Sequence, residues 1–208
     1  MTGYRTIAGA VTASFIEKKS EFIGNIAPCR TEEEAVAFIQ EIRRQHRRAT
    51  HNCYAYILRE NNIGRHSDDG EPSGTAGAPI FEVLKKEGLT DVCCVVTRYF
   101  GGIMLGAGGL VRAYTNGAKI AVDAAQIREM CMAERLRLTA GYSLYGKIGA
   151  ALSGFDVRVC NEDFAADVTV TLYVKEETSR ELSAQLTDIC CGKINIESLG
   201  VEEYDFGK

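Results

Sequence analysis

The sequence predicts an α+β protein with two domains. Apolar and polar residues alternate near the N-terminus, which is typical of strands, whereas apolar residues in 35–42 recur at helical spacing. Near Met130 the composition shifts and a second series of strands and helices begins. We therefore expect one domain at 1–130 and another at 131–208. No Pro- or Ser-rich linker separates them, so we expect the domains to touch.

The first domain is expected to combine antiparallel strands with three helices. A hairpin turn is predicted at 18–20, and Thr31 with Glu34 forms a capping box that begins a helix. Residues 91–97 are apolar on both faces, as expected of a buried central strand. The strands are expected at 4–11, 13–19, 20–29, 51–58, 63–67 and 91–97, and the helices at 31–48, 80–88 and 110–126. The last helix is rich in alanine and glycine, so it can lie close against a sheet.

The second domain is expected to follow the order βαββαβ in about seventy residues, which is the order of a ferredoxin-like domain. Its strands are expected at 135–141, 155–164, 166–174 and 193–204, and its helices at 142–152 and 176–191. Asn161, Glu162 and Asp163 are typical turn residues, so the two middle strands are expected to pair around them.

Composition limits the kinds of function. The chain has 208 residues, of which 46% are hydrophobic and 25% charged, and it has no apolar run long enough to span a bilayer and no secretory signal pattern. We expect a cytoplasmic protein with no membrane partner. The net charge of -4 gives no overall attraction to nucleic acid, so a basic site must be local. The eight cysteines show no metal-ligand spacing, and we expect reduced thiols, no metal and no cofactor.

The stretch TRYFGGIMLGAGGLVRAY, residues 97–114, joins the predicted buried strand to a helix through a glycine-rich loop. Free backbone N–H groups at such a junction can bind an anion, often a phosphate. Neither nucleotide fingerprint fits, because Val111 replaces the third glycine of GxGxxG and no Lys-Ser/Thr pair follows the glycines. The alternative is that the glycines serve tight packing alone. The candidate binding residues are Arg98, Tyr99, Gly101, Gly102, Gly106, Gly108, Gly109 and Arg112.

The acidic loop SDDGEPSGTAG supplies a second candidate set. Arg98 follows a buried strand and needs either an acidic partner or a ligand. We expect the loop to pair with Arg98 and to form a cleft beside it, with a solvated turn as the alternative. The loop residues in this set are Asp68, Asp69, Glu71, Ser73 and Thr75, and the last two are expected to cap the following helix. The calcium-loop pattern is absent.

A basic run forms the third candidate set. It consists of Arg43, Arg44, His46, Arg47, Arg48 and His51. We single out Arg47, Arg48 and His51 as candidates for contact with nucleic-acid phosphates; the alternative is a solvated helix end, which is the more usual role of such a run. No catalytic motif stands out. His51 and Cys53 share one face of a strand and are a conceivable nucleophile pair, but a buried thiol is favoured.

Three segments together resemble the signature of the IMPACT/YigZ family: HNCYAY at 51–56, SDDGEPSGTAGAPI at 67–80 and VVTRYFGGIMLGAGGLVRAY at 95–114. The resemblance covers almost the whole chain. It implies an N-terminal IMPACT domain with the fold of the second domain of a small-subunit ribosomal protein. It also implies a C-terminal ferredoxin-like domain similar to the fifth domain of translocating elongation factors, in agreement with the order read from the residues.

The resemblance also implies a link to translation. Eukaryotic members of the family restrain a starvation-sensing kinase by competing for its activator, and they use an additional N-terminal domain for that competition. This chain begins directly at the IMPACT domain and is similar to the bacterial form, so kinase regulation is not carried over. The family supplies no established catalytic residues.

The leading hypothesis is a cytosolic, non-enzymatic protein that binds RNA, the ribosome or a translation factor and regulates translation. Its cleft would lie between Arg98, Tyr99 and the 101–109 loop on one side and the 67–75 turn on the other. The alternative is an enzyme that acts on a nucleotide or another phosphate-bearing ligand, with Asp68, Asp69 or Glu71 as general base or magnesium ligand. A protein-interaction scaffold is the third hypothesis.

Overall fold

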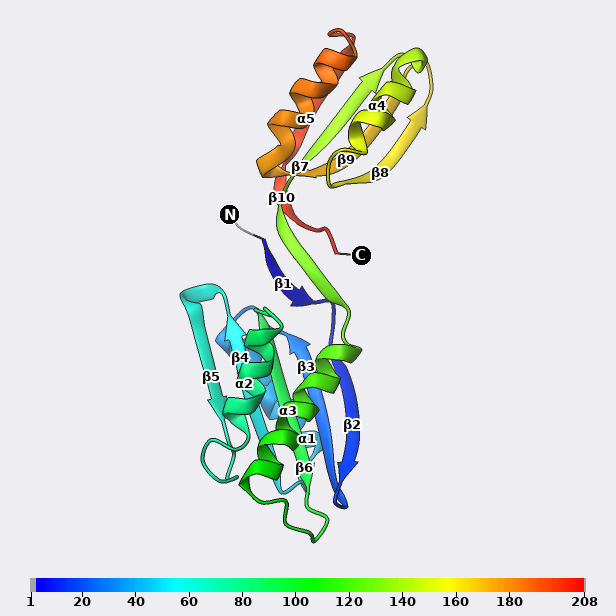
Figure 1. Cartoon of the computed structure of the whole chain (residues 1–208). Coiled ribbons are helices and arrows are strands. Elements are labelled where there is room, and N and C mark those ends of the chain that lie inside the picture. The colour runs from blue at the N-terminus through cyan, green and yellow to red at the C-terminus, as the bar shows by residue number, and fades with distance from the viewer. Residues whose placement is uncertain (1–2, 208) are drawn as a thin grey trace. The chain divides into compact units, whose positions relative to one another are not determined.

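The computed structural model describes residues 3–207, which form two compact units (Figure 1). One unit spans Tyr4–Arg128, and the other contains residues 129–207 together with Gly3. Both units combine antiparallel strands with helices, so the α+β class predicted from the sequence is confirmed. Among the described residues, no helix is long and apolar enough to cross a membrane.

The first unit is built on a five-stranded antiparallel sheet. Its strand order is β2 (Val11–Glu17), β3 (Ser20–Pro28), β6 (Val92–Tyr99), β4 (His51–Leu58) and β5 (Ile63–Ser67). Strand β6 lies at the centre, and its residues 92–98 are buried, as the apolar run predicts. The extended segment expected at 4–11 is instead interrupted at 8–10, so a short strand β1 (Tyr4–Ile7) precedes β2.

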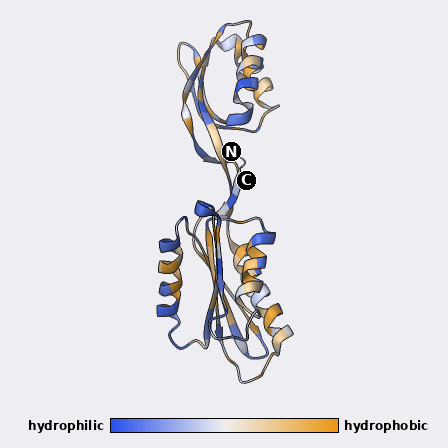
Figure 2. Cartoon of the chain, turned by 90° about the vertical axis from the view of Figure 1, so that its left-hand side faces the viewer, coloured by the Kyte–Doolittle hydropathy of each residue, from blue (hydrophilic) through white to orange (hydrophobic). Residues whose placement is uncertain are grey.

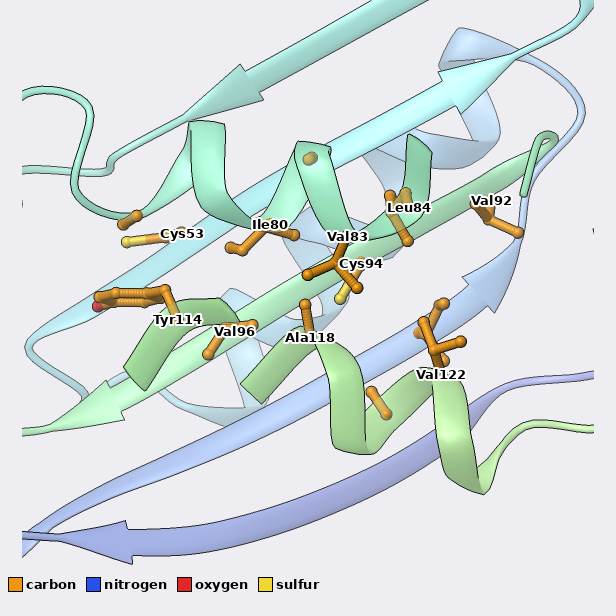
Figure 3. Close-up of a cluster of buried hydrophobic side chains, with 14 of the residues drawn as sticks. Cys53, Ile80, Val83, Leu84, Val92, Cys94, Val96, Tyr114, Ala118 and Val122 are labelled. Atoms are coloured by element: carbon orange, nitrogen blue, oxygen red, sulfur yellow. The ribbon is translucent and has the colours of Figure 1, made fainter. Parts of the chain in front are cut away.

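Helices cover both faces of this sheet (Figures 1 and 2). On one face, helix α1 (Glu32–Gln45) packs its buried residues against β4 and β6. On the other face lie α2 (Gly77–Lys86) and α3 (Ala107–Ala124). The central strand alternates between the two: Cys93 and Val95 belong to the α1 core, whereas Val92, Cys94 and Val96 belong to the α2 and α3 core (Figure 3).

Local signals in the sequence explain several boundaries. Lys18 and Lys19 both have positive φ, at 45° and 65°, which gives the two-residue hairpin between β2 and β3. Thr31 Oγ1 accepts a hydrogen bond from the Glu34 N–H at 3.3 Å and caps α1. The carboxylate of Glu34 accepts from the N–H of Arg30, one residue earlier than an ideal capping box requires.

The second unit has the predicted ferredoxin-like arrangement. Its sheet has the order β10-β7-β9-β8, with all neighbours antiparallel. In chain order its elements are β7 (Ile127–Ala140), the 3-10 turn η2 (Tyr142–Leu144), α4 (Tyr145–Leu152), β8 (Val157–Phe164), β9 (Val168–Lys175), α5 (Glu176–Ile189) and β10 (Ile194–Asp205). Leu136, Leu138, Leu172 and Leu182 are buried at the centre of its core.

The turn expected at Asn161, Glu162 and Asp163 is wrong. These residues lie within β8 and pair with β9, and the chain bends at 165–167 instead. Strand β8 is at the edge of the sheet and is almost entirely exposed, so polar side chains are accommodated on it. Their polarity reflects an exposed edge strand and does not mark a loop.

Close packing of α3 against β3 depends on two glycines. A Cβ atom on Gly24 would lie 2.1 Å from the carbonyl oxygen of Gly117, closer than any non-bonded contact allows. The small residues of α3 therefore let its backbone approach the sheet directly, as their abundance in the sequence predicts.

We predict that Gly24→Ala lowers the free energy of unfolding of the first unit by about 3 kcal/mol, because the helix must move away from the sheet. Urea denaturation would measure the change. Gly9→Ala is the matched control, since nothing lies within 4 Å of a Cβ atom at that position. Equal stability of the two variants would contradict the packing described for α3.

Candidate functional site

The acidic loop between β5 and α2 is bound to the sheet through a buried carboxylate. Oε1 of Glu71 accepts hydrogen bonds from Nη1 of Arg98 at 2.7 Å and from the hydroxyl of Tyr114 at 2.8 Å. The three residues are 8%, 6% and 0% exposed. Nε2 of His51 lies 3.8 Å from the same carboxylate oxygen. Glu71 thus joins the loop to β6, α3 and β4.

This geometry pairs Arg98 with the acidic loop, as the sequence suggests. The guanidinium pairs with Glu71 and lies over the rings of Phe22 and Phe100, at 5.5 and 5.4 Å from their centroids. Arg98, Glu71 and Thr75 are all buried. Tyr99 points to the opposite face of the sheet, where its hydroxyl lies 3.0 Å from Nδ1 of His46.

Asp68 caps helix α2, a role that the sequence assigns to Ser73 and Thr75. Its carboxylate accepts hydrogen bonds from the N–H groups of Gly74, Ala76 and Gly77 at 2.8 to 3.0 Å. The expected caps are wrong: the helix has no side-chain cap at Ala76, Thr75 donates its hydroxyl to the Pro72 carbonyl, and Ser73 is exposed. Burial raises the pKa of the Asp68 carboxyl, but the three N–H donors outweigh it, so the pKa lies below its usual value.

Asp69 makes the third link between the loop and the rest of the unit. Its carboxylate accepts from the N–H of Asn52 at 2.7 Å and from Nη2 of Arg43 at 2.5 Å. Its carbonyl oxygen lies 2.9 Å from Nδ1 of His51. Each of the three acidic side chains of the loop is therefore engaged by other groups of the protein, and the loop has a defined conformation.

Cys53 is buried beneath this loop. Its thiol donates to the carbonyl oxygen of Asp68 at 2.9 Å, and burial raises the pKa of the thiol well above its usual value. A thiol with a raised pKa is a poor nucleophile, so burial favours a packing role for Cys53. The other cysteines, all among the described residues, also carry free thiols.

The glycine-rich loop, residues 100–106, owes its glycines to backbone geometry. A Cβ atom on Gly101 would lie 2.0 Å from the carbonyl of Lys19, so this loop packs directly on the hairpin turn. Gly102 and Gly106 have φ values of +84° and +73°, which favour glycine. Helix α3 begins at Ala107, three residues before the expected start, so Gly108 and Gly109 belong to its first turn.

Hydrogen bonds bring three segments together at one edge of the sheet. The N–H of Phe100 donates to Oγ1 of Thr50 at 3.2 Å, and the N–H of Gly101 donates to Oγ of Ser20 at 3.1 Å. The N–H of Thr50 donates to the carbonyl of Arg98 at 2.8 Å. The hairpin turn, the turn after α1 and the glycine-rich loop are consequently neighbours.

Exposed cations gather on these segments and on the adjoining start of α3. We call them the basic edge: Lys18, Lys19, Arg47, Arg48 and Arg112. None of the five forms an ion pair with another residue in the described range 3–207. Two arginines that precede Arg47 in the sequence do form ion pairs: Arg43 pairs with Asp69, and Arg44 pairs with Glu41. Sequence reasoning treated Lys18 and Lys19 only as a turn, although two adjacent lysines at a hairpin tip are a sign of an exposed basic site.

Metal binding finds no support in this part of the molecule. Within residues 3–207, no three His, Cys, Asp or Glu side chains form a group that could hold a metal ion. The carboxylates proposed as magnesium ligands in the enzyme hypothesis each accept hydrogen bonds from the protein itself.

We predict that Glu71→Ala lowers the free energy of unfolding of the first unit by about 3–5 kcal/mol, because it leaves the Arg98 guanidinium buried without its partner. Urea denaturation at neutral pH would measure this loss. Glu82→Ala, an exposed position on α2, is the control and should change stability little. A loss below about 1 kcal/mol for Glu71→Ala would show that the ion pair does not hold the loop.

We predict that Asp68→Ala destabilises the protein by about 1–2 kcal/mol at neutral pH, the usual cost of removing a helix cap. The folded protein lowers the pKa of Asp68, so its contribution is present above the unfolded pKa of about 3.9 and is lost as the pH falls through the lower folded pKa. The difference from the wild type should be constant between about pH 7 and 5 and shrink below about pH 4. A difference that persists unchanged in acid would contradict capping by the carboxylate.

Comparisons with known proteins agree with this architecture. Residues 18–122 match the family described as Impact N-terminal domain, and residues 138–193 match a domain of unknown function, DUF1949. The chain is 41% identical over 195 residues to "IMPACT family member YvyE" of Bacillus subtilis (strain 168), covering 93% of this chain and 90% of that protein. It is 34% identical to "IMPACT family member YigZ" of Escherichia coli (strain K12), covering 94% and 97%.

A solved structure is also similar along nearly the whole chain. It is described as "Crystal structure of an hypothetical protein" and has a TM-score of 0.61 at 32% identity, covering 96% of this chain and 98% of that one. The three segments singled out in the sequence all fall within the Impact N-terminal match. They also build the network around Glu71 and the loops beside it. The chain belongs to the IMPACT family.

Proposed function

We propose that the protein is a cytosolic, non-enzymatic regulator of translation that binds the phosphate backbone of RNA through its basic edge. One observation carries this proposal: five exposed cations without ion-pair partners among the described residues converge on one edge of a protein whose net charge is -4. Cations that are not engaged within the protein can neutralise phosphates without first breaking an internal ion pair.

The surroundings of the basic edge suit a nucleic acid. Hydrogen bonds from the glycine-rich loop fix the spacing of the segments, so the backbone that carries the cations needs little ordering on binding and the cost falls on their side chains. Phe100 is 48% exposed in that loop and can stack on a base, an interaction that single-stranded RNA readily makes. The net negative charge elsewhere favours one orientation of the protein toward a polyanion.

The ribosome is the RNA-bearing partner that this proposal favours. The support is the resemblance of the three sequence segments to a family linked to translation, together with the location of those segments beside the basic edge. Fold and family alone do not assign a partner, so the exposed cations of the basic edge are the main support for RNA binding. The enzyme hypothesis has no comparable support, because the carboxylates it requires are engaged in hydrogen bonds and ion pairs within the first unit.

We predict that the wild-type protein binds single-stranded RNA through about five phosphate contacts. Each contact should contribute about -0.7 to the slope of log K against log salt concentration. Replacing Lys18, Lys19, Arg47 and Arg48 by alanine should weaken binding at low salt and reduce the slope by about 0.7 per contact removed. Fluorescence anisotropy with a labelled oligonucleotide at several salt concentrations would measure both quantities.

The matched control for the pair Lys18→Ala with Lys19→Ala is Lys85→Ala with Lys86→Ala, which removes two exposed lysines at the end of α2. These lysines precede β6, whereas the basic edge lies where β6 ends, so their loss should leave RNA binding nearly unchanged. Ribosome co-sedimentation of the same variants would extend the test to the natural assembly. Absence of RNA binding at low salt, or equal loss in the control, would contradict the proposal.

A further inference from the structure

A pocket of about 280 Å³ opens between the end of β2 and the first half of α3, beside the basic edge. It is lined by Phe15, Glu17, Lys18, Leu105, Gly109, Arg112, Ala113 and Asn116. Apolar atoms of Phe15, Leu105 and Ala113 form part of the wall, and charged or amide side chains form the rest. The residues come from the hairpin, the glycine-rich loop and α3, so this pocket is separate from the closed network around Glu71.

The apolar part of the pocket is held in place by the core beneath it. The Phe15 ring stacks on Phe22 with centroids 5.2 Å apart, and Phe22 meets the edge of Tyr114 at 5.4 Å. Both Phe22 and Tyr114 are fully buried. Leu105 packs closely on α3, because a Cβ atom at Gly109 would lie only 3.0 Å from that of Leu105. The wall is therefore formed before any ligand arrives.

The polar part of the pocket is unoccupied by protein partners. Glu17, Lys18, Arg112 and Asn116 make no side-chain hydrogen bond or ion pair with any residue that the structure describes. Four polar side chains, one anion, two cations and an amide, thus line one small pocket without hydrogen bonds or ion pairs to other described protein groups. All four side chains are exposed, so a ligand that displaces their water must replace the lost hydrogen bonds; a ligand with a polar rim can do so, whereas an aliphatic ligand cannot.

We propose that this pocket binds an unstacked nucleobase of single-stranded RNA; this rests on the proposed function and names the part of the RNA that the site reads. A base has apolar faces and a hydrogen-bonding rim, which matches Phe15 and Leu105 beside Glu17 and Asn116. The cations Lys18 and Arg112 are placed to hold the attached phosphate. The volume is near the lower limit of small-ligand sites and suits one base.

The carboxylate of Glu17 gives the pocket a preference. A carboxylate only accepts hydrogen bonds, so it pairs best with an exocyclic amino group, whereas the ring N–H of uracil lies between two carbonyl oxygens that repel a carboxylate. Cytosine presents such a donor at N4, whereas uracil presents an acceptor at the equivalent position. Oligocytidylate should accordingly bind more tightly than oligouridylate of the same length and charge.

A single tryptophan in the pocket would test this proposal, because the chain contains none. Phe15→Trp places the fluorophore in the wall, where a stacked base should quench it. Titration of the full-length variant with oligocytidylate should give saturable quenching, and an abasic oligomer of equal charge should give little. Adding Asn116→Ala should weaken the quenching affinity by about three- to tenfold. Adding Thr115→Ala, an exposed neighbour on α3 outside the pocket, should leave it unchanged.

The possible outcomes distinguish the base-binding pocket from phosphate binding by the basic edge. Equal quenching by the abasic oligomer, or equal behaviour of Asn116→Ala and Thr115→Ala, would overturn the base site. Cytidine monophosphate that binds as tightly as the oligomer would also overturn it, since the ligand would then be a free nucleotide. Salt-sensitive RNA binding without quenching would refute the pocket and leave the proposed function intact. If neither oligomer binds at low salt by anisotropy, the proposed function itself fails.

Discussion

The buried ion pair between Arg98 and Glu71 is the interaction on which the arrangement of the first unit depends. It joins the end of the central strand β6 to a loop that contains little regular structure of its own. Tyr114 adds a hydrogen bond from α3 to the same oxygen. A charge buried at this depth requires its partner, so the position of the loop is coupled to the position of the strand. Asp68 and Asp69 then carry the constraint to α2, β4 and α1.

Among the residues that identify the family, some hold the fold together and others are exposed and available for binding. The histidine, the acidic loop and the arginine are joined to one another by hydrogen bonds and an ion pair, and the Arg98 side chain is buried. They also set the position of the glycine-rich loop, because Arg98 directly precedes Tyr99 and Phe100 in the chain. The loop in turn lies on the hairpin turn and begins α3. A rigid interior thus fixes the spacing of exposed cations, which is the property that a backbone-binding surface needs.

Much of the fold could be predicted from local patterns, and the long-range hydrogen bonds could not. The cap at Thr31, the two-residue hairpin at Lys18 and Lys19 and the βαββαβ order depend on neighbours in sequence, and the structure contains them. Asp68 caps a helix that begins nine residues later, so no spacing rule near the helix reveals it. Three acidic residues of the loop are possible partners of Arg98 in the sequence, and the folded loop places Glu71 beside it. Asn161 was assigned to a turn because polar residues mark turns and exposed edge strands alike.

The most direct test of this account is to replace the buried network by apolar side chains and then to measure the affinity for RNA. A variant with Arg98→Met, Glu71→Leu and Tyr114→Phe removes the charges and the hydroxyl together, so no group is left buried without its partner among the three. If the network is structural and the basic edge binds RNA, the folded variant will retain the wild-type dissociation constant and its salt dependence. A variant that keeps the wild-type circular dichroism spectrum and the wild-type amide chemical shifts of the glycine-rich loop, and still loses RNA affinity by tenfold or more, would contradict the account and return Arg98 to the binding site.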